Sequence, residues 1–257
     1  MSVTLRVIKG TLVAGAFLTL RSTISELGWL DGLLYLFHEA ARRATGERFM
    51  FRKYYLVSQP VPGKRLLPVN RAASISVRQV YEDDDVVKSF PRPRDVLDRR
   101  FASGAKCFIA RKGERFAGFL WLKSDIYDED EVRCRFRPLP AGNTVWDFDV
   151  HVEPEHRGSL VFAKLWDEAN EILRVQGVLW SVSRISAFNR GSLQSHAKLG
   201  AIPVGSACFF SIGKFQVTLS PARPFFHLST DAGSWPEIVI RADRPKAIAR
   251  FDRILKR

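Results

Sequence analysis

Apolar and polar residues alternate along several short stretches of the chain after about residue 74. The alternation is clearest at residues 144–152 and predicts a β-strand there. One face of this strand would carry Trp146, Phe148, Val150 and Val152, and the other would carry Asp147, Asp149 and His151. Pro154 and Gly158 then mark a turn, so the polar face ends where the chain changes direction.

Patterns of the same kind predict further strands, and two pairs of them are joined by short turns at residues 111–114 and at Gly213. These strands are expected at residues 75–81, 106–110, 115–123, 178–185, 202–212 and 215–219. Residues 125–137 are polar and are predicted to form a lid-like loop or a strand with insertions.

Apolar residues that recur every three or four positions predict amphipathic helices. Such helices are expected at residues 27–44, 160–176 and 189–199, each followed closely by a glycine. A fourth helical pattern, at residues 86–101, is interrupted by Pro91 and Pro93.

These patterns divide the chain into three regions. Residues 1–70 are predicted to form an N-terminal helical extension that ends in an irregular linker, because residues 58–65 contain two prolines and a glycine. Residues 71–220 carry the main series of strands and helices, and residues 221–257 form a C-terminal basic tail. The mixture of elements predicts an α/β fold of the α+β type.

Charge and composition describe a basic globular protein. The hydrophobic share of 46% is sufficient for a buried core, and 40 Lys and Arg against 27 Asp and Glu give a formal net charge of +13. Such an excess attracts polyanions. The basic residues are scattered along the chain, which favours a basic surface over nucleic-acid binding.

The N-terminal residues 11–20 are apolar and follow Arg6 and Lys9. This stretch is too short to span a bilayer, and no cleavage pattern follows it, so we expect no signal peptide. A helix on a membrane surface and a helix docked on the domain are both left open. Cys107, Cys134 and Cys208 lie far apart without metal-ligand spacing, so we expect no metal and a cytoplasmic protein with reduced cysteines.

The junction after residue 152 has the chemistry of an anion site. A turn from a strand into a helix exposes backbone N–H groups, and the helix dipole adds partial positive charge. Arg157 adds a cation, and Gly158 allows close backbone approach. An ordinary strand-to-helix connection capped by Ser159 is the alternative, and the junction alone does not decide between them.

Four segments in order resemble the GCN5-related N-acetyltransferases (GNAT enzymes). They are Ile75-Ser-Val-Arg-Gln-Val, Phe108 to Leu122 with its hairpin turn, Val152-Glu-Pro-Glu-His-Arg-Gly, and Asn189-Arg-Gly-Ser-Leu-Gln-Ser-His-Ala-Lys-Leu-Gly-Ala. The resemblance covers about residues 74–220. It implies a mixed, mainly antiparallel central sheet flanked by helices.

The resemblance also implies an acyltransferase that uses acetyl-CoA or another acyl-CoA. By this resemblance the strand end would hold the pantetheine arm, the next loop would hold the pyrophosphate, and the late helix would also contact the donor. The positions in these three segments are Val150, His151, Val152, Arg157, Gly158, Ser159, Leu160, Val161, Asn189 and Ser192. His196 lies where many members place the acid that protonates the leaving thiolate. The family loop has small residues where this chain has Leu160 and Phe162, which reshapes the wall beside the phosphates.

Catalysis on an amine needs a base that removes its proton. Asp147 and Asp149 would lie about 7 Å apart on one strand face, where two carboxylates raise one another's pKa. Salt bridges to neighbouring arginines are the alternative for both. The side chains of Glu155 and His156 are expected to face solvent.

Three functions are carried forward from the sequence. The first is an N-acyltransferase that acts on a small-molecule or peptide amine. The second is an acyltransferase that takes its donor from an acidic acyl carrier protein, attracted by the basic surface. The third is a catalytically inactive GNAT-like module that binds a partner or a membrane. A homodimer is also left open.

Overall fold

The structure is a computed structural model, and it describes residues 22–25, 27–68 and 70–244. The predicted N-terminal apolar stretch at residues 11–20 and the end of the predicted basic tail lie outside these residues.

The elements succeed one another along the chain as α2 (Trp29–Ala44), β1 (Phe49–Pro60), β2 (Ile75–Val80), η1 (Asp85–Ser89), α3 (Arg94–Ala102), β3 (Lys106–Lys112), β4 (Arg115–Lys123), β5 (Tyr127–Asp128), β6 (Arg135–Leu139), β7 (Thr144–Val152), η2 (Pro154–His156), α4 (Val161–Val175), β8 (Trp180–Ser186), α5 (Arg190–Lys198), β9 (Ile202–Ile212), β10 (Phe215–Leu219), β11 (Phe226–Ser229) and β12 (Glu237–Arg241). The described strands form a nine-stranded sheet in the order β11-β10-β9-β1-β8-β7-β4-β3-β2 and a three-stranded sheet in the order β12-β6-β5.

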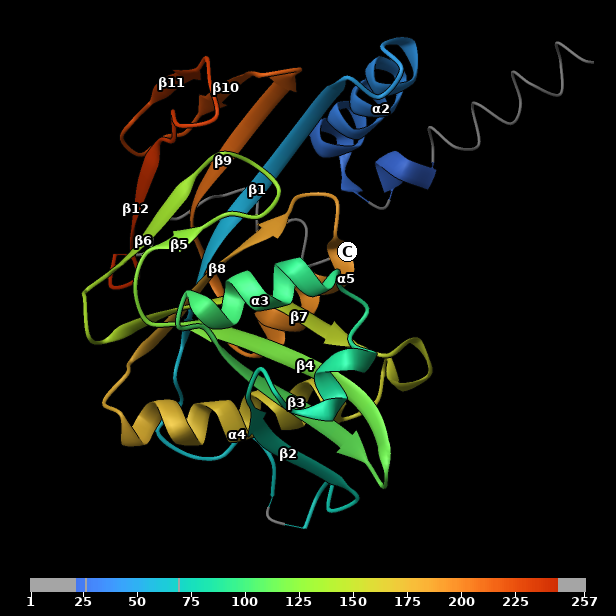
Figure 1. The fold of residues 1–257 in the computed structure, drawn as a ribbon, viewed down its shortest axis with the longest axis vertical. Helices are drawn as coiled ribbons and strands as arrows, with labels where there is room; N and C mark the ends of the chain where they lie inside the picture. The colour runs from blue at the N-terminus through green and yellow to red at the C-terminus, as the bar shows by residue number, and fades with distance from the viewer. Residues whose placement is uncertain (1–21, 26, 69, 245–257) are drawn as a thin grey trace, which may run out of the picture.

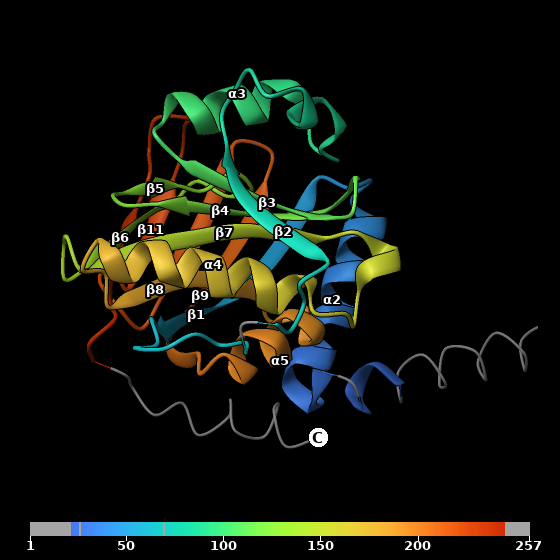
Figure 2. The same ribbon diagram turned by 90° about the horizontal axis from the view of Figure 1, so that it is seen from below.

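Three layers are visible when the molecule is viewed along the sheet (Figure 2). The helices α2, α4 and α5 lie on one face of the large sheet, and α3 lies on the other. The small sheet shares the side of α3, because Phe136 and Ile238 from its strands join the same buried cluster as Leu97 of α3. The predicted mixed, mainly antiparallel sheet flanked by helices is confirmed: β7–β8 is the parallel pair of the large sheet.

Most predicted elements are present with nearly the predicted bounds. The amphipathic helix α4 packs its apolar side on the sheet through Val161, Leu165, Trp166, Ala169 and Leu173. Two prolines divide the predicted helix at residues 86–101 into η1 and α3. The polar segment at residues 125–137 contributes β5 and β6 to the small sheet, and part of the predicted tail forms β11 and β12.

Strand β1 corrects the prediction for the N-terminal region (Figure 1). Residues 49–60, which the sequence placed in a helical extension and the start of its irregular linker, form a twelve-residue strand that lies between β8 and β9, inside the large sheet. Tyr54 lies opposite Ser186 on β8 and Ala207 on β9. The N-terminal region therefore supplies part of the central sheet as well as the helix α2.

A buried ion pair fixes α2 on β1. The Lys53 Nζ lies 2.5 Å from Asp31 Oδ1, and the Tyr55 hydroxyl donates a 2.7 Å hydrogen bond to Asp31 Oδ2. Asp31 and Lys53 are both buried. A charge removed from water is tolerated only when it is paired, so these contacts define how the helix docks.

Replacing Asp31 by Asn should therefore destabilise the protein strongly. The variant leaves the Lys53 ammonium buried without an opposite charge, which costs about 3–5 kcal/mol of the free energy of unfolding. Urea unfolding measures this loss. The matched control is Asp95→Asn, which removes an exposed ion pair with Arg99 and should cost less than about 1 kcal/mol. Equal losses in the two variants would contradict the role of the Asp31–Lys53 pair.

Candidate functional site

The parallel strands β7 and β8 are paired only at their beginning. Thr144, Val145 and Trp146 pair with Trp180, Ser181 and Val182, and no later residue of β7 pairs with β8. On its other edge β7 continues to pair with β4 as far as Val152. The second half of β7 therefore presents an unpaired backbone edge toward β8, which is a suitable place for an extended ligand.

A β-bulge at Asp149 accompanies this separation. Phe119 lies opposite His151, but Trp121 lies opposite Phe148, so β7 contains one extra residue across from β4. Asp149 is the bulged residue, and its φ is 47°. Gly118 of β4 permits the close approach of the bulged strand, because a Cβ atom there would lie 2.3 Å from the carbonyl oxygen of His151.

The bulge overturns the prediction that Asp147 and Asp149 share one face of the strand. Trp146 and Phe148 join the cluster on the α3 side, whereas Val150 and Val152 pack with α4 on the other side. One extra residue reverses the alternation, so every side chain after Phe148 changes face. Asp147 consequently interacts with Ser181, and Asp149 with arginines near α3.

A cavity of about 460 Å³ lies where the two strands separate, and we call it the β7–β8 slot. Its walls come from β7, β8, α3, α5 and the loop around residue 130. The predicted site residues that line it are Asp147, Asp149, Val150, Asn189, Ser192 and His196. The predicted residues 151–152 and 157–161 do not line it, although they continue directly from the strand.

Asp147 is a buried carboxyl group at the paired end of the slot. The Ser181 hydroxyl donates a 2.6 Å hydrogen bond to its Oδ2. Burial raises the pKa of Asp147 to about 7, and the hydrogen bond from Ser181 only partly opposes this effect. Ser183 lies close enough to lower the pKa as well, but its hydroxyl makes no hydrogen bond of good geometry within the described chain. Asp147 can thus gain or lose a proton near neutral pH.

Asp149 is held by two arginines. The Arg92 Nε donates a 2.8 Å hydrogen bond to Asp149 Oδ2, and Arg100 Nη1 contacts the same oxygen at 2.5 Å. Burial alone would raise the pKa of Asp149, but the hydrogen bonds and charges of these arginines outweigh it and lower the pKa. Asp149 is therefore a paired carboxylate, which is the alternative that the sequence left open.

His196 forms part of the slot wall on α5. Its Nδ1 lies 3.3 Å from Gln59 Oε1, and its ring meets the edges of Phe162 and Trp166. Burial lowers the pKa of His196 to about 4, so the imidazole is uncharged at neutral pH. Asn189, from the same region, caps α5 by accepting a 3.0 Å hydrogen bond from the Ser192 N–H.

The junction between β7 and α4 has free backbone donors. The N–H groups of Gly158, Leu160, Phe162 and Ala163 meet no acceptor among the described residues. Ser159 receives a 3.3 Å hydrogen bond from the Val161 N–H, and the Arg157 Nε donates one to the Val152 carbonyl. The side chains of Leu160 and Phe162 pack against the α4 core cluster. Free amides at a helix start, with Arg157 exposed beside them, are the donors that an anion site at this junction would need.

Sequence reasoning missed the charged residues that surround the slot on the α3 side. Arg92, Arg100 and Arg184 line it, and Arg100 also contacts Asp130 at 2.6 Å. Arg184 pairs with Glu129, and the Tyr54 hydroxyl donates to Glu131. These partners are distant in the sequence, so the strand and helix patterns carried no signal for them. The nearest indication of these charged contacts in the sequence was the group of acidic residues in the predicted lid-like loop at residues 125–137.

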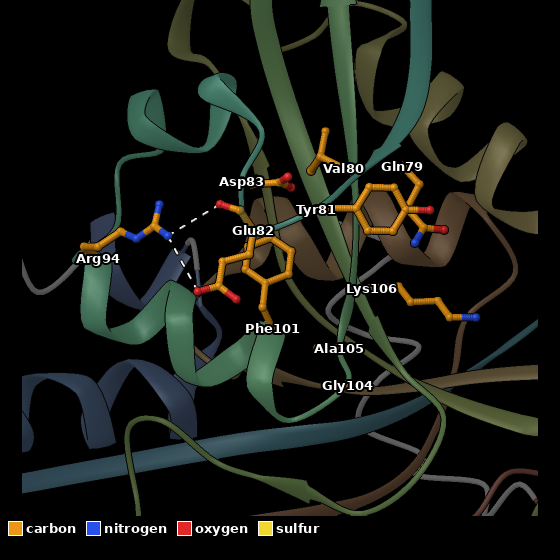
Figure 3. A pocket seen from close by; sticks show the side chains of 10 residues that line it. All are labelled: Gln79, Val80, Tyr81, Glu82, Asp83, Arg94, Phe101, Gly104, Ala105 and Lys106. Atoms are coloured by element: carbon orange, nitrogen blue, oxygen red, sulfur yellow. Dashed lines mark hydrogen bonds and ion pairs between the residues drawn. The ribbon is translucent and has the colours of Figure 1, made fainter.

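A second hollow lies at the end of β2, away from the slot (Figure 3). Arg94 and Glu82 form an ion pair on one side of it, and the exposed ring of Tyr81 lies toward the other side. Its volume is about 670 Å³, and its lining contains none of the predicted site residues. We therefore place the candidate site in the β7–β8 slot.

The substitution Asp147→Asn should change how stability depends on pH. The folded carboxyl has a pKa of about 7, whereas an Asp in the unfolded chain titrates near pH ~4. Between these values the unfolded chain releases a proton that the folded protein keeps, so the contribution of Asp147 to the free energy of unfolding decreases from about pH 4 to about pH 7 and then levels off.

The variant lacks this titration and should lose that part of the slope. Urea unfolding of the two proteins across this pH range gives the comparison. All other titrating groups are common to both proteins, so parallel stability curves would contradict a buried, protonated Asp147.

No protein-family model and no curated protein matches the chain in sequence. Three solved structures illustrate its similarity in fold. A conserved protein of unknown function from Staphylococcus epidermidis has a TM-score of 0.46 and 12% identity, over 68% of this chain and 66% of that one. A putative GNAT acetyltransferase from Novosphingobium aromaticivorans has a TM-score of 0.43 and 15% identity, over 64% and 68%. A putative acetyltransferase from Salmonella typhimurium with acetyl-CoA has a TM-score of 0.36 and 16% identity, over 68% and 99%.

These likenesses are remote, and the fold is assigned from the chain's own topology. The strands β2, β3, β4, β7 and β8 lie side by side in chain order. The last two separate to form the slot, and a helix with free amide groups follows β7. This arrangement agrees with the fold that the resemblance to the GNAT enzymes implies.

Proposed function

We propose that the protein is an acyltransferase that moves an acyl group from a pantetheine thioester, such as acetyl-CoA, to an amine. The observation that carries the proposal is the slot between β7 and β8. A pantetheine arm is narrow and extended and has amide groups, so it can pair with a free strand edge as another strand would. The unpaired edge of β7 after Trp146 offers that partner.

The phosphates of the donor would bind at the start of α4. A pyrophosphate could accept hydrogen bonds there from the guanidinium of Arg157 and from the free N–H groups of Gly158, Leu160, Phe162 and Ala163. Val150, His151 and Val152 would contribute backbone groups between this loop and the slot. Leu160 and Phe162 need not block the site, because their side chains pack against the α4 core cluster and their N–H groups stay free.

Asp147 is the best candidate for the proton transfers. An amine that attacks a thioester must lose a proton, and a carboxyl group with a pKa of about 7 can accept it, directly or through water. The same proton can then pass to the departing thiolate. Backbone N–H groups of the bulged strand would stabilise the oxyanion.

Asp149 and His196 receive different roles in this proposal. Asp149 is paired with Arg92 and Arg100, so it would hold the bulge and the slot open instead of taking the amine proton. His196 is uncharged at neutral pH and would form the wall beside the thioester. Asn189 and Ser192 would line the donor side.

A donor held on an acyl carrier protein is the second candidate. Two bulky residues, Leu160 and Phe162, replace the family's small loop residues, and the net charge of +13 would attract an acidic carrier. Binding of an acyl carrier protein that weakens steeply with salt, together with no binding of coenzyme A, would favour this donor. If neither donor binds, a catalytically inactive module remains.

Filling the slot should prevent donor binding. Ser192 lines the slot from α5, so the substitution Ser192→Trp should weaken the binding of coenzyme A by about tenfold or more, a loss of at least ~1.4 kcal/mol. Isothermal titration calorimetry with coenzyme A measures the change. Ser195→Trp, in the same helix but outside the slot lining, is the matched control and should bind as the wild type does. Equal affinities in both variants would reject the slot as the donor site.

The substitution Asp147→Asn should reduce turnover by about 100-fold or more, because it removes the proton acceptor. Thiol release from acetyl-CoA, measured with a panel of amines, reports the rate. The wild-type rate should increase as pH rises through about 7, where Asp147 becomes ionised, and the variant should lack this step.

Asp149→Asn and His196→Gln serve as comparisons for the same assay. Both should keep the step near pH 7 even where they lower the rate, because neither side chain is assigned the proton transfer. A loss below about threefold in Asp147→Asn would reject its role as base or acid.

A further inference from the structure

The outer end of the large sheet exposes an apolar face. Five residues on β9, β10 and β11 have side chains between 41% and 60% exposed, and we call them the apolar end face: Ile212, Phe215, Leu219, Phe226 and Leu228. Ile212 lies opposite Phe215, and Leu219 lies opposite Phe226. Residues opposite one another in an antiparallel pair share a face, so these side chains form one surface.

The two faces of these strands differ sharply. On the inner face Gln216, Thr218 and Ser229 are buried, and Gln216 exchanges hydrogen bonds with the backbone of Arg133. The outer face carries the large apolar side chains instead. This distribution is the reverse of an ordinary solvated edge, where the exposed positions are polar. An exposed apolar surface of this kind marks a contact with another apolar phase.

Helix α2 lies at the same end of the molecule as β10 and β11 (Figure 1). Phe37 of α2 meets Phe49 with ring centroids 5.9 Å apart, and Phe49 lies opposite Ile212. Helix α2 carries an exposed apolar side chain at every fourth position, at Trp29, Leu33 and Phe37. One side of the helix therefore extends the apolar end face beyond the sheet.

Cations without acidic partners lie around the apolar end face. Arg48 precedes β1, Lys214 lies in the turn between β9 and β10, and Arg223 lies in the loop before β11. All three are exposed, and none forms an ion pair with a described residue. The Lys214 Nζ lies 5.4 Å from the centre of the Phe215 ring, so charge and apolar surface adjoin directly.

We infer that the apolar end face and the exposed side of α2 form a docking surface for an anionic lipid bilayer. Phenylalanine and tryptophan side chains enter the interfacial region of a bilayer, while adjoining lysine and arginine bind its negative headgroups. A second copy of the chain fits less well, because a two-fold contact would bring the same unpaired cations together. None of the residues in this surface lines the slot.

The sequence before α2 agrees with this placement. Residues 11–20 are apolar and follow Arg6 and Lys9, so the sequence before α2 also combines apolar residues with cations. Among the residues that the structure describes, no helix is long and apolar enough to cross a membrane.

Sedimentation of the full chain with vesicles tests the inference. The protein should bind vesicles of phosphatidylcholine that contain phosphatidylserine and should bind pure phosphatidylcholine far less. The combined substitutions Phe215→Ser, Phe226→Ser and Leu228→Ser should weaken binding about tenfold or more, since each removes an inserting side chain. These positions are on the surface, so the variant should keep its fold and its response to coenzyme A.

Two further variants separate the contributions. Val175→Ser with Leu179→Ser removes side chains that are 81% and 56% exposed at the other end of the molecule and should leave binding unchanged. Lys214→Glu with Arg223→Glu should weaken binding to the anionic vesicles only. The inference is overturned if the wild type does not sediment with anionic vesicles, if the control pair loses as much binding as the triple variant, or if light scattering shows a dimer that the triple variant dissolves.

Discussion

The candidate site depends on the way β7 departs from regular strand geometry at Asp149. The bulge reverses the direction of the later side chains and accompanies the loss of pairing with β8. Gly118 makes this geometry sterically acceptable from the side of β4. Arg92 and Arg100 hold the displaced carboxylate from the side of α3. A regular strand at this position would pair along its whole length and leave no slot.

The two aspartates of β7 illustrate how environment separates chemically identical groups. Asp147 is buried beside the hydroxyl groups of Ser181 and Ser183, and burial raises its pKa to about 7. Asp149, two residues later, faces two guanidinium groups and stays ionised. One carboxyl group is thereby available for proton exchange, while the other has a structural partner. The bulge produces this difference, because without it both side chains would share one environment.

Much of the fold could be predicted from the sequence, since β7, β9, β10 and α4 have clear periodicity and well-placed turn residues. Strand β1 could not, because it is covered on both faces and shows no alternation. Its polar residues also hid it: Lys53 is neutralised by Asp31, and the Ser58 hydroxyl donates to the Ala242 carbonyl from the other end of the chain. Such partners are decided by tertiary structure and leave no local pattern.

The residues that line the candidate site could be predicted only in part, because some lie in segments with a local pattern and others do not. Asp147, Asn189 and His196 lie in segments with strong local signals, and the structure brings all three to the slot. The bulge was missed because Asp149 continues the apolar and polar alternation perfectly in sequence. The arginines were missed because Arg92 and Arg100 reach Asp149 from a segment more than forty residues earlier, as the separations of 57 and 49 residues show.

The position of β1 also has a consequence for how the chain folds. This strand is synthesised early, yet its neighbours in the sheet are β8 and β9, near the other end of the chain. Its backbone groups therefore hydrogen-bond to water, or are protected by other molecules, until most of the protein has left the ribosome. Pairings between such distant segments are slow to form because a long loop has to close first. The pairings of β1 with β8 and β9 are therefore expected to form after the local hairpins β9–β10 and β10–β11.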